Sequence, residues 1–134
     1  MRSILEGNQI LAMIFKNEDW KEGLHFLTPQ NLFIQAGTWY YPKGKKLASH
    51  LHKDYERTAL RTQELVYVRK GSLKVFVYND RKELKEEFIL SEGEMAVMAY
   101  GGHGYEILEE GTQVLEVKNG PFISVEHDKN KFES

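Results

Sequence analysis

The sequence predicts an all-β domain of the sandwich or barrel type. Segments rich in β-branched and aromatic residues are separated by Gly, Pro, Asn and Asp turn signals roughly every eight to twelve residues, as in such folds. The chain has 134 residues, which suits a single domain, 1–134, with one core. The predicted strands are 10–15, 24–27, 32–41, 64–69, 73–78, 87–90, 95–100, 105–108 and 114–118.

The connections between these strands are predicted from turn chemistry. Strands 64–69 and 73–78 are expected to form a hairpin, because Lys70-Gly71-Ser72 is a turn signal. The best helix candidates are 53–65 and 80–87, and the second is better explained as a charged hairpin between two strong strands. We expect the domain core at about 33–118, with N-terminal strands at 10–27 and a polar tail at 127–134.

Composition excludes several classes of function. The formal net charge is −2, so no basic surplus recruits nucleic acid or an anionic membrane. Cysteine is absent, which rules out disulfides and thiolate metal sites. The N-terminus lacks the apolar stretch of a signal peptide, and no segment has the apolar length of a transmembrane helix. The expected compartment is therefore the cytoplasm.

A pair of histidines carries the first chemical signal. His50 and His52 are two residues apart, and on a β-strand this spacing points both imidazoles to one face. A carboxylate from a nearby strand would complete three ligands for a divalent metal. Glu64 is a candidate, because it shares a strand face with Val66 and Val68, and a carboxylate on an apolar face requires a partner.

These residues belong to a longer pattern that resembles the first motif of the cupin family. Gly44, five residues, His-x-His, a glutamate, six residues and Gly71 match that motif, although the interval from His52 to Glu64 is longer than usual. The second motif is degenerate. Gly93 and Gly101 fit it, Ala99 stands where proline is usual, and His103 comes one residue early. The chain thus resembles a small single-domain cupin over about 33–118.

The resemblance implies a double-stranded β-helix, or jelly-roll barrel, that forms a homodimer. It also implies a metal inside the barrel, held by His50, His52, Glu64 and His103, with one or two positions open for water or substrate. Imidazole and carboxylate ligands suit Fe, Mn, Ni, Zn or Cu, and the ligand types alone do not select among these metals. The alternatives are that His50 and His52 are surface histidines and that His103 is an exposed turn residue.

Other residues are candidates for contacts with a ligand. A helical turn in the insertion 53–63 would place Arg57 and Arg61 on one side, where they would suit a phosphate or carboxylate. The alternative is that they pair with Asp54 and Glu56. The remaining candidates are Tyr41 and Gln63 for substrate binding, and Tyr100 and Tyr105, which bracket the glycine turn, for proton transfer. Gln63 is expected to face away from Glu64.

Three classes of function follow. The first is a metal-dependent cupin that binds or transforms a small polar molecule such as a carbohydrate, since the 116–122 segment and the Gly-Gly-His-Gly turn resemble small cupins found with bacterial surface-polysaccharide enzymes. The second is a metal-free sugar-nucleotide epimerase or ketoisomerase, in which His50 or His52 is the base and Tyr100 or Tyr105 the acid. The third is a non-catalytic ligand-binding or sensor cupin.

Overall fold

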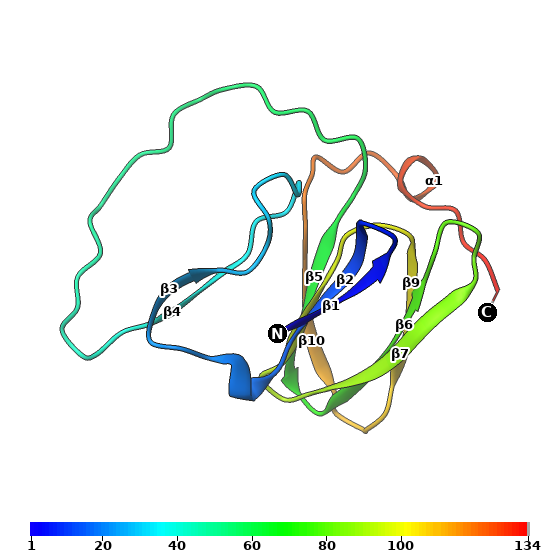
Figure 1. Cartoon of the computed structure of the whole chain (residues 1–134), viewed down its shortest axis with the longest axis horizontal. Helices are drawn as coiled ribbons and strands as arrows, with labels where there is room; N and C mark the ends of the chain where they lie inside the picture. The colour runs from blue at the N-terminus through cyan, green and yellow to red at the C-terminus, as the bar shows by residue number, and fades with distance from the viewer. Residues whose placement is uncertain (134) are drawn as a thin grey trace.

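The strands of this protein form three antiparallel sheets (Figure 1). The structure is a computed structural model that describes residues 1–133. The larger sheets have the strand orders β1-β2-β8-β5-β10 and β7-β6-β9, and of the described strands β3 and β4 pair only with each other. The predicted all-β class is confirmed, and the strands described in this range do not close into a barrel.

The five-stranded sheet contains β1 (Arg2–Glu6), β2 (Gln9–Phe15), β8 (Met95–Met98), β5 (Glu64–Lys70) and β10 (Gln113–Lys118). The three-stranded sheet contains β7 (Leu84–Ser91), β6 (Ser72–Tyr78) and β9 (Gly102–Ile107). The small sheet contains β3 (Gly23–Phe26) and β4 (Gly37–Tyr40). In the part of the chain that the structure describes, helices are limited to the 3-10 turn η1 (Asn17–Asp19) and α1 (Val125–Asp128). Within residues 1–133, neither helix has the length and apolar character needed to cross a bilayer.

The main core lies between the two larger sheets. Alternate residues of β5 and β6 point inward, so Val66 and Val68 pack with Leu73, Val75 and Val77. The neighbouring strands complete this cluster with Ile4, Leu11, Ala12, Ile14, Phe88, Leu90, Ala96 and Met98. Because Glu64 begins β5 on the same face as Val66 and Val68, its carboxylate enters the end of the core.

The outer face of the five-stranded sheet is also covered in part. Leu32 and Ile34 pack there against Met13, Val97 and Ala99. The side-chain oxygen of Gln63 accepts hydrogen bonds from the backbone N–H groups of Phe33 and Ile34, at 2.8 and 3.2 Å. The prediction that Gln63 faces away from Glu64 is therefore confirmed, and Gln63 holds the covering segment in place.

The predicted hairpin between 64–69 and 73–78 is wrong. Its two segments are strands, but β5 pairs with β8 and β10, whereas β6 pairs with β7 and β9. The chain crosses from one sheet to the other at Gly71, which has φ +83°. Both strands have an apolar inner face, and two such faces can be buried against each other only in opposite sheets. A hairpin joins β6 and β7 instead, which confirms the charged hairpin predicted at 80–87.

The helix candidate at 53–65 is also wrong. Residues 45–63 contain no helix or strand, and β5 begins at Glu64. A helix over this segment would have little apolar surface to bury, and Leu60 is 85% exposed. Residues 41–63 form a wide segment that leaves the small sheet and returns to β5 (Figure 1).

The ends of the chain and one strand boundary differ from prediction. The sequence pattern missed β1, and of the predicted strand 32–41 only β4 is a strand, because Leu32 and Ile34 cover the five-stranded sheet instead. In the predicted polar tail, α1 ends at Asp128, and Phe132 then packs edge-on against Tyr78, with ring centroids 5.1 Å apart. This aromatic contact ties the C-terminal segment to the hairpin.

Candidate functional site

A hydrogen-bonded group of three side chains lies at one end of the core. Glu64 Oε1 accepts a hydrogen bond from the hydroxyl of Tyr105 at 2.5 Å and lies 2.8 Å from Nε2 of His103. The register of β9 explains this arrangement, because His103 lies opposite Val77 and Tyr105 opposite Val75, both of which point into the core. His103 and Tyr105 therefore face the inner side of β5, where Glu64 is only 4% exposed.

Electrostatics keep the Glu64 carboxylate ionised. Burial by itself would raise the pKa of Glu64, but the hydrogen bonds from His103 and Tyr105 and the charge of His103 outweigh it and lower this pKa to about 2. Burial and the nearby negative charge of Glu64 raise the pKa of the Tyr105 phenol well above its ordinary value. At neutral pH, Tyr105 is thus a donor to a carboxylate anion.

Two further charged residues reach this group from β10. The pairing of β10 with β5 places Lys118 beside Glu64 and Glu116 beside Val66, on the inner face. Lys118 Nζ is 4.0 Å from Glu64 Oε2 and 3.6 Å from Glu116 Oε1. A hydrogen bond with Glu64, together with burial, raises the pKa of Glu116. This end of the core therefore holds two carboxyl groups that shift each other's pKa, with Lys118 close to both.

A cavity of about 560 Å³ opens next to Glu64 and His103. The β6–β7 hairpin, the turn at 101–104 and the C-terminal segment 128–132 form its other walls. Its lining carries four permanent cations and, besides Glu64, two acidic groups: Arg61, Lys82, Lys129 and Lys131, and Asp80 and Asp128. A volume of this size matches a small ligand of the size of a sugar or nucleotide.

Arg61 has a defined position at the cavity. Its Nη2 donates a hydrogen bond to the carbonyl oxygen of Gly101 at 3.0 Å, and its guanidinium lies 5.2 Å from the ring centroid of Tyr100. The Nε–H of Arg61 is buried and has no hydrogen-bond partner among residues 1–133. A buried charged donor without a partner costs free energy.

The turn before His103 depends on glycine. Gly101 has φ +72°, and a Cβ at this position would lie 2.1 Å from the carbonyl oxygen of Tyr78. A Cβ at Gly102 would lie 3.1 Å from the ring of Phe132. The close approach of this turn to the β6–β7 hairpin sets the start of β9, and with it the direction of the His103 side chain.

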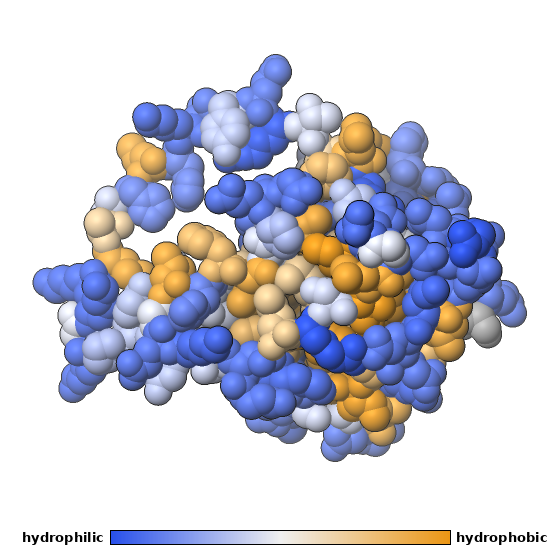
Figure 2. Space-filling view, in the orientation of Figure 1, coloured by the Kyte–Doolittle hydropathy of each residue, from blue (hydrophilic) through white to orange (hydrophobic). Residues whose placement is uncertain are grey.

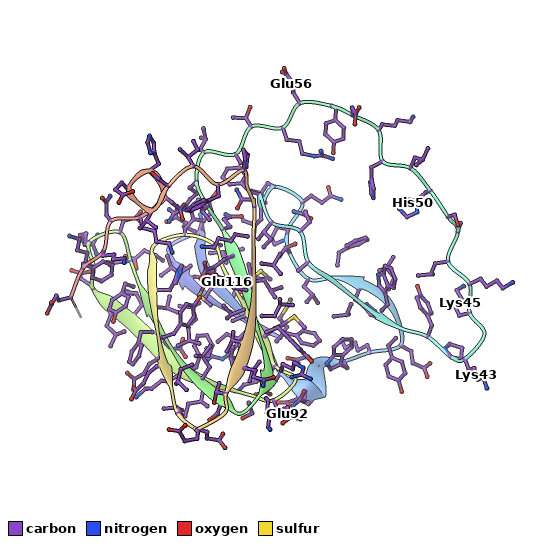
Figure 3. All side chains as sticks on the ribbon, turned by 180° about the vertical axis from the view of Figure 1, so that it is seen from behind. Lys43, Lys45, His50, Glu56, Glu92 and Glu116 are labelled. Atoms are coloured by element: carbon purple, nitrogen blue, oxygen red, sulfur yellow. The ribbon has the colours of Figure 1, made fainter. Side chains whose placement is uncertain are left out.

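Of the four predicted metal ligands, the structure brings together only Glu64 and His103. His50 and His52 lie outside any strand, in the exposed part 42–60 of the 41–63 segment, and their ring centroids are 4.9 Å apart. Figure 3 shows His50 on this segment together with Lys43, Lys45 and Glu56, away from the larger sheets. Within residues 1–133 no three His, Asp or Glu side chains converge as metal ligands. In this conformation the predicted ligand set does not fit a metal.

The other predicted site residues lie in different parts of the molecule. Tyr105 joins the group around Glu64, whereas Tyr100 packs on the core beneath Arg61. Arg57 stacks on the exposed Tyr55, with its guanidinium 3.7 Å from the ring centroid. Tyr41 lies at the far end of the small sheet, with Lys45 Nζ 5.3 Å from its ring centroid.

Sequence reasoning missed Lys118, Glu116 and Phe132. The alternation of 113–118 could have indicated the first two, since it places Val114, Glu116 and Lys118 on one strand face. Phe132 carries no comparable signal, because its position depends on how the C-terminal segment returns to Tyr78.

Comparison with known proteins yields no relative. No protein-family description matches the chain, and searches of curated proteins and of solved structures find no significant match.

Proposed function

We propose that this protein is a metal-free acid–base enzyme of the isomerase or epimerase class that acts on a small polar molecule. The observation that supports this proposal most is the Glu64–His103–Tyr105 group at the wall of the cavity. In this proposal His103 replaces His50 and His52 as the base. Tyr105 acts as a positioning residue, because its hydroxyl is bound to Glu64 and its side chain does not line the cavity.

The chemistry begins with the two nitrogens of the His103 ring. When Nε2–H donates to Glu64, Nδ1 carries the lone pair and can accept a proton from a carbon next to a substrate carbonyl. The ionised Glu64 then stabilises the imidazolium, and the hydrogen bond from Tyr105 holds the carboxylate in place. Return of the proton to the same or a neighbouring carbon gives an epimer or an isomer.

The charges of the cavity favour an anionic sugar derivative as the ligand. Four cationic side chains line the cavity, and a guanidinium such as that of Arg61 is suited to phosphate or carboxylate oxygens. Phe132 and Tyr78 add aromatic surface against which a sugar ring or base can pack. Sugar nucleotides combine these features and are the first ligands to test.

Exchange of substrate hydrogen with solvent tests this function directly. The protein is incubated in D₂O with a panel of keto-sugar nucleotides, and loss of the proton signal next to the carbonyl is followed by NMR. We expect wild-type protein to catalyse exchange with at least one member, and His103→Asn to slow it by about 100-fold or more, because the general base is gone. His25→Asn is the matched control, since that ring bonds to the Glu22 carbonyl away from the cavity. Equal exchange rates for His103→Asn and wild type would refute the role of His103.

A second candidate function is that of a metal-binding cupin, and the position of His103 on an edge strand favours it. Among the described strands β9 and β10 are edge strands, and β9 carries His103 next to Glu64. If residues 46–52 paired with the free edge of β9, the sandwich would approach a closed double-stranded β-helix, and His50 and His52 would come to the side of the molecule that holds the cavity. The donors then available would be suited to a divalent transition metal.

Metal analysis separates the two candidates. The metal-binding candidate predicts near-stoichiometric Fe, Mn, Ni, Zn or Cu in the tag-free protein by inductively coupled plasma mass spectrometry. It also predicts loss of that metal in the double variant His50→Ala/His52→Ala, because both imidazoles are ligands. Unchanged metal content in the double variant would exclude these histidines as ligands. Exchange that persists after chelation supports the metal-free candidate.

A further inference from the structure

The small sheet has one apolar face that is exposed. We call the two strands β3 (Gly23–Phe26) and β4 (Gly37–Tyr40) the arm. The register pairs Leu24 with Trp39 and Phe26 with Gly37, so Leu24, Phe26 and Trp39 share one face. Phe26 is 74% exposed and Trp39 is 64% exposed. Gly37 leaves room for the Phe26 ring, because a Cβ there would lie 3.2 Å from Cδ1 of that ring.

This arm is not stable by itself. Two strands of four residues with three exposed large apolar side chains are marginal in water, and the described strands provide no third partner. The arm projects from the two larger sheets, and the 41–63 segment leaves it in a wide path (Figures 1 and 2). Another surface is therefore expected to cover its apolar face.

A matching surface lies on the outer face of β10. Leu115 is 57% exposed, and Val117 is exposed as well. The register places Leu115 beside Tyr67 and Val117 beside Leu65 of β5, which gives an uncharged, apolar stripe across two strands. Burial of two apolar sheet faces against each other is the packing that stabilises β-sandwiches.

We propose that a second copy of this chain covers the arm. In this dimer the arm of each copy lies on the β10 stripe of the other. A two-fold axis relates these two identical contacts, so the exposed apolar surfaces of both copies are buried. Charge supports the same pairing. Lys43, Lys45 and Lys46 follow β4, whereas Glu109 and Glu110 precede β10, and these opposite charges meet when the far end of the arm lies near the start of the strand. The proposal does not depend on the proposed activity.

Oligomeric state is the first test. Sedimentation velocity of the full chain is expected to show a dimer that dissociates on dilution. Phe26→Ser is expected to raise the dimer dissociation constant by at least about 30-fold, as for loss of a central aromatic contact. Phe122→Ser is the matched control, because Phe122 is 68% exposed but lies on neither surface. A wild-type chain that stays monomeric, or equal weakening by both variants, would overturn the proposal.

A cross-link tests which surfaces meet. The chain has no cysteine, so a variant carrying both Trp39→Cys and Leu115→Cys is expected to form a disulfide-linked dimer under mild oxidation. Each single-cysteine variant is expected to remain uncross-linked under the same conditions, because each cysteine then faces a native side chain. Efficient cross-linking of Trp39→Cys alone would mean that the arms contact each other, and it would refute the arm-to-β10 arrangement. Circular dichroism of each variant checks that the sheets are intact.

Discussion

Glu64→Ala is expected to lower the free energy of unfolding by about 2–3 kcal/mol at pH 7, which urea denaturation measures. The carboxylate of Glu64 accepts from both His103 and Tyr105, so its removal leaves two donors unpaired at the end of the core. Tyr105→Phe removes only one of these hydrogen bonds and should cost about 1 kcal/mol. A loss below about 0.5 kcal/mol for Glu64→Ala would show that the group contributes nothing to the fold.

The same substitution should change the response of stability to acid. The pKa of Glu64 is lowered from 4.5 to about 2 in the folded protein, so its contribution is complete above pH 4.5 and disappears as the pH falls toward 2. The stability difference between wild type and Glu64→Ala should therefore shrink across this interval. Unfolding curves collected across this pH range measure the difference. A difference that stays constant down to pH 2 would contradict an ionised Glu64.

Glu116→Gln is the control for the loss of a negative charge beside Glu64. Glu64 raises the pKa of Glu116 through their hydrogen bond, so the two carboxyl groups change stability in opposite directions and in different pH ranges. Its folded pKa exceeds the unfolded one, and ionisation of Glu116 therefore costs stability as the pH rises above 4.5. The glutamine variant should match or slightly exceed wild type at pH 7, whereas Glu64→Ala should not.

Gly101→Ala is expected to destabilise the protein by about 3 kcal/mol, from left-handed backbone strain and a steric clash together. Gly101 has φ +72°, and the added Cβ would lie 2.1 Å from the carbonyl oxygen of Tyr78 and 3.2 Å from Leu11. This turn also supplies the carbonyl that Arg61 binds and begins the strand of His103. The variant should therefore lose solvent exchange of the substrate together with stability.

The matched control for this substitution is Gly111→Ala. Gly111 has φ +76°, and among residues 1–133 no heavy atom outside Gly111 and its two chain neighbours lies within 4 Å of its expected Cβ. It therefore carries the backbone strain without the clash and should cost about 1 kcal/mol. Thermal unfolding of both variants separates the two effects. Equal melting temperatures for the two would mean that the turn can move away from Tyr78, and that it does not hold β9 rigidly.

The group around Glu64 could be predicted only in part. The sequence places Glu64 on an apolar strand face with Val66 and Val68, and the burial of Glu64 agrees with this prediction. The resemblance to the cupin motifs groups His103 with Glu64 in one site, but nothing in the sequence relates Tyr105 to Glu64. The distance between these residues depends on how the two sheets stack, which local alternation does not specify.

The sequence by itself determined the all-β class, most strand positions and the shared face of Glu64, Val66 and Val68, because side-chain alternation and turn residues act over a few neighbouring positions. Only the tertiary structure decided which strands pair. It separated β5 from β6, joined His103 and Tyr105 to Glu64, and left His50 and His52 on an exposed segment. Those outcomes depend on burying whole sheet faces against each other. The free energy of this burial comes from contacts between residues that are far apart in the chain.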